Sequence, residues 1–287
     1  MNLLNHTTRW MERASDRLNP ILVKETRQAL KGRMFQVIFL LFLLTSWSIL
    51  SLGILSHGTR IQTSPTAPWF FGLYYAVLGF AIFVIVPFAA YRSLLNERDE
   101  NTYELLNITT LGPRQIVRGK LASAMVQAFL YYSAIAPFIA FTSLLNGFNL
   151  PWVVLVLVLS LLWSGVLSVF ALMLSSLSDQ RPWQMANLVG LLILLLIGWY
   201  ISIAMAVQAD LQRSSFEDPE FWWTVGLATA FALSYGVLAH QFAAARLTFA
   251  AGNRSTGIRV TCSVQFWMLA IGLAEVVERA RRFQGIV

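Results

Sequence analysis

Six long apolar runs divide the chain and predict most of its structure. Each run holds at least about 20 residues, which is the length that an α-helix needs to cross the hydrocarbon core of a bilayer. The runs therefore predict an all-α polytopic membrane protein with six transmembrane helices. The first run is too long for the core of a signal peptide and is expected to remain as an anchor. The predicted spans cover residues 34–55, 69–91, 121–145, 152–174, 185–205 and 221–244.

A basic tail, residues 1–33, precedes the first span. Within it, Asn19-Pro20 has the form of an N-cap followed by Pro at the first helical position, and Gly32 can end the helix that begins there. Charged and apolar residues alternate between these points in a helical rhythm. We therefore predict an amphipathic elbow helix in the membrane interface. The alternative is a basic tail that only sets the membrane topology.

The C-terminal segment, residues 245–287, is predicted to be cytoplasmic or interfacial. It contains a shorter apolar run, residues 261–277, which ends among charged residues. A seventh span would place three arginines outside, so an interfacial helix is favoured. The run is also compatible with the start of a second membrane block, if this chain is the truncated first half of a longer permease.

The largest polar segment between the spans is residues 92–120, which holds four of the 14 acidic residues. Asn101 can serve as an N-cap, with Glu104 three residues later, where its side chain can reach back. Leu105 and Leu106 then supply an apolar face, and Gly112-Pro113 breaks the helix and begins another. The pattern predicts a short helix at the membrane surface that can dock a soluble partner, although most such loops are only solvated connections.

This segment resembles the first cytoplasmic loop of type-2 ATP-binding-cassette (ABC) exporter permeases, and the resemblance covers residues 19–250 in outline. In that family the loop is a coupling helix that touches the ATPase subunit. Asn101 departs from the family, which usually has Gly before the Thr. The elbow helix has a counterpart there too, with a Glu-x-Arg such as Glu25-Thr-Arg27. The resemblance assigns ATPase coupling to Glu97, Arg98, Thr102, Glu104, Leu105, Leu106, Gly119 and Lys120.

The resemblance also implies partners: an ABC ATPase subunit, which would carry ATP and Mg, and a second permease subunit, identical or related. The expected function is the transmembrane subunit of an ATP-driven exporter. The alternative is a non-transporting membrane scaffold or assembly factor that recruits a soluble partner through loop 92–120. A secondary carrier is disfavoured, because none of the six predicted spans contains Asp, Glu, Lys or Arg and ion-coupled carriers usually need such groups.

The basic residues predict the orientation. With the N-terminus in the cytoplasm, only Arg60 and Arg213 of the 21 Lys and Arg residues lie outside. The positive-inside rule therefore predicts a protein of the cell membrane with both termini on the cytoplasmic side. The composition, 57% hydrophobic and 12% charged, is that of a membrane protein rather than a soluble domain. The net charge of +7 is therefore assigned to membrane topology and not to nucleic-acid binding.

No set of catalytic residues stands out in the sequence. The single cysteine excludes an internal disulfide and a cysteine-based metal cluster, and no cofactor or metal is expected on this chain. The stretch from Gly112 to Lys120 has the wrong spacing for a phosphate-binding loop. The chain is therefore predicted not to be an enzyme, and any ATP-driven step must use another subunit.

Polar and helix-breaking residues inside the spans indicate where the helices meet. Gln127 and Tyr131 are four residues apart and share a helix face. They are candidates for a substrate path along a lateral groove, or for a hydrogen bond between helices. Pro87 and Pro137 are expected to kink their spans. Three serines at four-residue spacing allow close helix packing or a dimer face: Ser160, Ser164 and Ser168.

Overall fold

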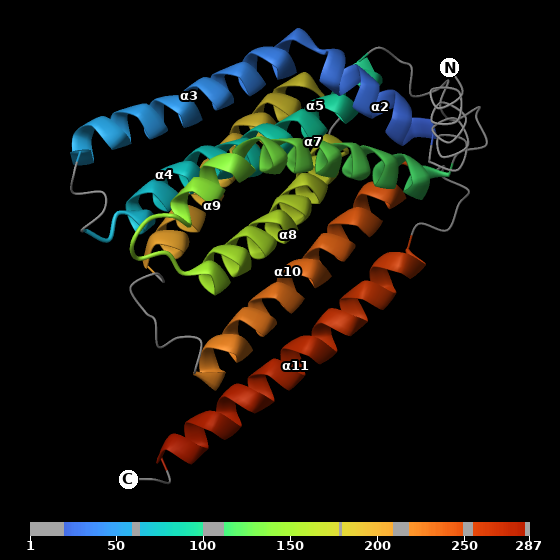
Figure 1. Ribbon diagram of the computed structural model, residues 1–287. Helices are drawn as coiled ribbons and strands as arrows, with labels where there is room; N and C mark the ends of the chain where they lie inside the picture. The colour runs from blue at the N-terminus through green and yellow to red at the C-terminus, as the bar shows by residue number, and fades with distance from the viewer. Residues whose placement is uncertain are drawn as a thin grey trace, which may run out of the picture.

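The computed structural model describes residues 20–58, 64–99, 112–177, 180–208, 218–248 and 255–284. These residues form long helices packed in a bundle (Figure 1), and no strand occurs among them. The elements are α2 (Pro20–Lys31), α3 (Arg33–His57), α4 (Ala67–Phe80), the π-helix η2 (Ala81–Ile85), α5 (Val86–Asp99), α7 (Pro113–Thr142), α8 (Leu150–Ser175), α9 (Arg181–Gln208), α10 (Pro219–Arg246) and α11 (Thr256–Gln284).

Within the described ranges, six helical segments are long and apolar enough to cross a membrane, which confirms the six predicted spans. The helices continue past the apolar runs into polar sequence. The third helix begins at Pro113, as predicted, and enters the apolar run at residue 121, since Pro113 is preorganised for the first helical position. The six segments are Arg33–His57, Ala67–Asn96, Pro113–Thr142, Leu150–Ser175, Arg181–Val207 and Pro219–Arg246.

The second span is the centre of the bundle. The side chains of Phe70, Tyr74, Leu78 and Ile82 along it are fully buried. α8 packs against α5 on one side and against α10 on the other. In contrast, α3, α9 and α10 bury few of their residues and expose large apolar side chains. Because exposed apolar surface of this extent suits a hydrocarbon environment, these outer helices are the ones expected to face lipid.

The second span contains a π-helix directly before Pro87. The Val86 amide donates to the Ala81 carbonyl, five residues back, as the wider π turn requires. The next amide would belong to Pro87, which has no N–H to donate to the Ile82 carbonyl. The Ser164 hydroxyl of α8 donates to that carbonyl instead, over 2.7 Å. The second span thus holds a π-helix next to Pro87, and its extra acceptor is satisfied by a neighbouring helix. The kink at Pro87 stays a prediction.

The elbow region follows its predicted boundaries. α2 begins at Pro20 and ends at Lys31, and Gly32, with extended backbone (ψ 128°), separates it from α3. The chain changes direction at this point (Figure 1). α2 packs against the first part of α7 and against α3. Its position at a membrane interface stays a prediction.

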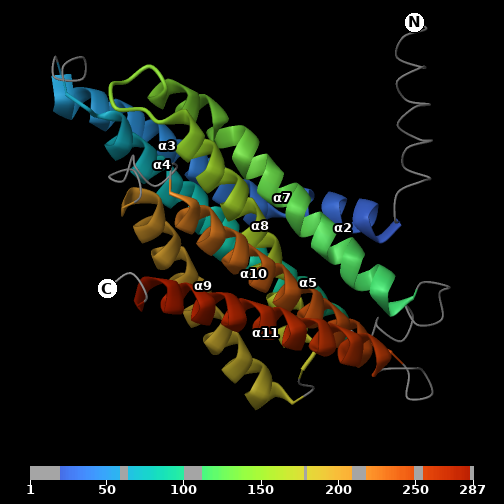
Figure 2. The ribbon, with the colours of Figure 1, turned by 90° about the horizontal axis from the view of Figure 1, so that it is seen from below.

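The C-terminal region is one continuous helix, longer than the expected 261–277 segment. α11 runs back along α10 in the opposite direction, as Figures 1 and 2 both show. Thr261, Gln265 and Gly272 are buried, and Phe266 and Trp267 are exposed. α11 therefore turns its small and polar side towards the bundle, and its interfacial location stays a prediction.

Candidate functional site

The predicted coupling segment lies between the end of α5 and the start of α7. Glu97 and Arg98 belong to the last turn of α5. The predicted short helix, residues 101–108, lies outside the described residues, as do Thr102, Glu104, Leu105 and Leu106. The helix predicted to begin at Pro113 does begin there, and the Gly112 amide donates to the Gln115 side chain over 3.1 Å. It continues through Gly119 and Lys120 into the membrane span, as predicted.

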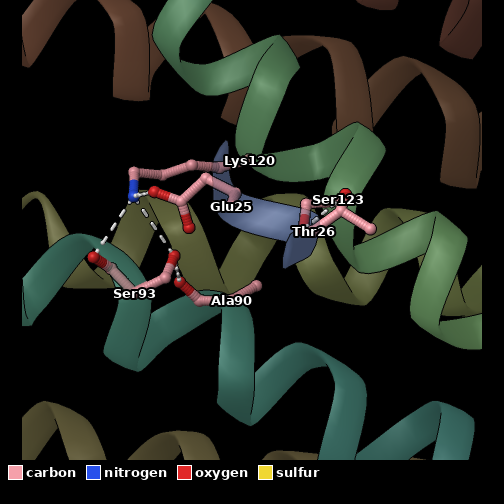
Figure 3. Close-up of polar contacts among 6 residues, drawn as sticks. All are labelled: Glu25, Thr26, Ala90, Ser93, Lys120 and Ser123. Atoms are coloured by element: carbon pink, nitrogen blue, oxygen red, sulfur yellow. Dashed lines mark hydrogen bonds and ion pairs between the residues drawn. The ribbon is translucent and has the colours of Figure 1, made fainter. Parts of the chain in front are cut away.

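Lys120 is the centre of a polar cluster that joins three helices. Its Nζ lies 2.8 Å from the Glu25 Oε1 of α2 and donates to the Ser93 carbonyl of α5 over 3.2 Å (Figure 3). The Lys120 side chain is only 1% exposed and that of Glu25 13%. We refer to Glu25, Ser93 and Lys120 as the three-helix clamp. The clamp ties the elbow helix to both helices that border the coupling segment.

The burial of Lys120 explains why the clamp needs all of its parts. A charged group withdrawn from water is tolerated only when it is paired and its hydrogen-bonding capacity is used. The Glu25 carboxylate supplies the opposite charge and the Ser93 carbonyl a further acceptor. The Thr26 hydroxyl, one residue further along α2, lies 3.4 Å from that of Ser123 on α7. α2 is therefore fixed to α7 by two successive polar contacts.

A cavity of about 590 Å³ lies beside the clamp, among α2, α3, η2, α5, α7 and one residue of α9. Gln127 and Tyr131, the two residues predicted to line a groove, both line this cavity. The Tyr131 ring packs against Phe35, Phe39 and Phe42 of α3. Its hydroxyl is buried and has no hydrogen-bond partner among the described residues. The alternative interpretation, a hydrogen bond between helices, is therefore not seen for Tyr131.

The arrangement offers binding and mechanical linkage. The described residues contain no group of three or more His, Cys, Asp or Glu that could hold a metal ion. The polar groups of the clamp are already used by one another. What the region provides is a rigid connection between three helices and an amphipathic cavity beside it.

Sequence reasoning placed Lys120 in the coupling segment but did not find its partners. Glu25 was noted only as part of a family-like Glu-x-Arg. A usable signal existed: Glu25 is the single acidic residue of α2, and Lys120 is the last charged residue before the third apolar run. The single acidic residue of a basic helix is a candidate partner for a lysine at the entrance of a span, because neither charge can be buried alone.

The described part of the chain holds six helices that are long and apolar enough to span a membrane, and this defines a multi-pass helical membrane protein. No protein-family model and no curated protein matches the sequence.

Proposed function

We propose that this chain is the transmembrane subunit of an ATP-driven type-2 ABC exporter, acting with a separate ATPase and a second permease subunit. The observation that carries the proposal is the three-helix clamp. It joins the elbow helix to the two helices that border the polar segment 100–111. The sequence pattern of that segment, with Leu105 and Leu106 beside charged neighbours, supports its role as the ATPase contact.

The clamp supports a mechanical form of coupling. A docked ATPase that moves segment 100–111 would pull on the end of α5 and the start of α7 together. α7 is a single helix of 30 residues with Pro137 near its C-terminal end, about 45 Å long at 1.5 Å per residue. Motion at Pro113 would thus pass through the helix to the far side of the membrane. Because Lys120 pairs with Glu25, the elbow helix would move with it.

The ATPase contact is tested by a double substitution in the coupling segment. Leu105→Asp/Leu106→Asp places two charges where an apolar contact is proposed, so the chain should still insert but should lose its ATPase partner. The measurement is ATP turnover and identification of bound proteins after pull-down of the tagged chain in detergent. Asn107→Asp/Thr109→Asp adds the same charge to the same segment and should retain the partner.

Two results would contradict the proposal. Normal recovery of the ATPase with Leu105→Asp/Leu106→Asp would remove the docking assignment. A bound partner that hydrolyses no nucleotide would favour the alternative, a membrane scaffold that recruits a soluble protein.

A further inference from the structure

The cavity beside the clamp has a charged end and an apolar end. Lys24 and Arg92 line the charged end, on α2 and α5, together with the Lys120–Glu25 pair. Apolar side chains line the rest, among them Phe35, Ile38, Val84, Phe88 and Leu192. The volume, about 590 Å³, lies within the range of about 300–1,000 Å³ typical of small-molecule sites. The lining therefore suits a molecule with one polar end and one apolar end.

The charges at the polar end favour an anion. The carboxylate of Glu25 is paired with Lys120 at 2.8 Å, which cancels the only negative charge among the lining residues. The side chains of Lys24 and Arg92 are exposed at the rim, and the Arg92 guanidinium lies 6.0 Å from the Phe88 ring centroid. Two further cations thus line the same cavity from different helices. A phosphate or carboxylate between them would gain charge-assisted hydrogen bonds.

The buried Tyr131 hydroxyl is an independent sign of a ligand. Tyr131 is 0% exposed, lines the cavity and lies about three helical turns beyond Lys120 on α7. An unpaired hydroxyl in an apolar setting is costly, and its hydrogen-bond partner is missing from the described part of the chain. An oxygen acceptor on a ligand would remove that cost.

We propose that this cavity binds an anionic amphiphile. Its acidic headgroup lies between Lys24 and Arg92, an oxygen below the headgroup accepts a hydrogen bond from Tyr131, and its chain lies against Phe35 and Val84. The inference goes beyond the proposed function, because binding concerns this chain alone. Its failure would leave the ATPase contact untouched, and loss of the ATPase contact would leave binding intact.

The test measures binding to the purified full chain in dodecyl maltoside by native mass spectrometry. The probe is 1-oleoyl lysophosphatidic acid, and the comparison is 1-oleoyl lysophosphatidylcholine, which has the same chain but no net charge. We expect one site that prefers the lysophosphatidic acid by at least about tenfold, since two charge-assisted hydrogen bonds distinguish the headgroups. Lys24→Gln/Arg92→Gln should abolish the preference.

Two single substitutions test the location. Ala89 lines the cavity, so Ala89→Trp should fill it and block binding, whereas Ala228→Trp on the exposed side of α10 should not. Tyr131→Phe should weaken binding of the lysophosphatidic acid, whose chain is attached through an ester, about 3- to 10-fold, the usual value of one hydrogen bond. It should not change binding of the ether analogue, which lacks the ester carbonyl. The ligand-free melting temperature should not fall, because the hydroxyl has no described partner to lose.

A two-chain phosphatidic acid, offered in nanodiscs, distinguishes a membrane lipid from a single-chain amphiphile as the ligand. Binding equal to that of the single-chain probe indicates a membrane lipid, and exclusion of the two-chain form indicates a single-chain amphiphile. Equal affinity for the anionic and zwitterionic probes would overturn the proposal. A preference that survives both Lys24→Gln/Arg92→Gln and Ala89→Trp would also overturn it. If Tyr131→Phe binds lysophosphatidic acid as tightly as the unchanged chain does, Tyr131 is not part of the site.

Discussion

The three-helix clamp and the π-helix junction satisfy buried polar groups in opposite ways. The clamp uses a full ion pair, Lys120 with Glu25, near the ends of the helices. The junction lies inside the second span and uses only neutral donors, with the Ser164 hydroxyl and the Trp199 indole donating to the carbonyls of Ile82 and Ala76. Charge is thus found where helices enter polar sequence, and neutral hydrogen bonds where they run through apolar sequence.

The difference shows what each region can do. The free energy of a buried ion pair rises strongly when one partner is lost or the two partners move apart, because the remaining charge is then buried without compensation. A neutral hydrogen bond to a helix carbonyl costs less to break. The clamp borders the proposed ATPase contact and can respond to it. The junction instead holds the second span, α8 and α9 together, irrespective of partners.

Breaking the clamp should have the largest effect. Lys120→Met removes the cation and leaves Glu25 without its partner, so the free energy of unfolding should fall by about 3 kcal/mol. The measurement is unfolding by sodium dodecyl sulfate in mixed micelles. Glu25→Gln/Lys120→Met removes both charges and should recover most of the loss. A double variant as unstable as the single one would show that the pair itself, and not the orphaned charge, stabilises the chain.

Breaking the junction should have a smaller effect. Ser164→Ala leaves the Ile82 carbonyl without its donor, and Pro87 cannot replace it, so the expected loss is about 1–2 kcal/mol. Ser168→Ala is the matched control, since Ser168 is equally buried but its hydroxyl bonds to its own helix, at the Ser164 carbonyl. The same unfolding assay should show little change for the control. Equal losses for the two variants would mean that packing, and not the freed carbonyl, decides the result.

The sequence predicted the parts of this fold that depend on local pattern. Apolar length identified the six spans, and the special backbone of Pro and Gly located the start of α7 and the break at Gly32. Pro87 indicated a distortion of the second span but not its form. The freed carbonyl of Ile82 is satisfied by Ser164, which lies 82 residues further along the chain. No periodicity in the sequence contains that information.

The candidate site shows the same limit. The family resemblance singles out Lys120, and polarity within an apolar run singles out Gln127 and Tyr131. The partner of Lys120 is 95 residues away and the cavity is made by several helices, so neither follows from local spacing. The coupling helix, residues 101–108, stays a prediction because it lies outside the described residues.

The smallest effect in this comparison should come from the second bond of the junction. Trp199→Phe removes the indole N–H that donates to the Ala76 carbonyl over 2.9 Å, but it keeps an aromatic ring beside Phe80. Hydrogen bonds between helices in membranes average about 0.6 kcal/mol, so a loss of less than about 1 kcal/mol is expected in the unfolding assay. Trp163→Phe, at a half-exposed position of α8, should change nothing. If Trp199→Phe costs more than Ser164→Ala, the junction depends on the packing of α9 against α4 rather than on the carbonyl freed by Pro87.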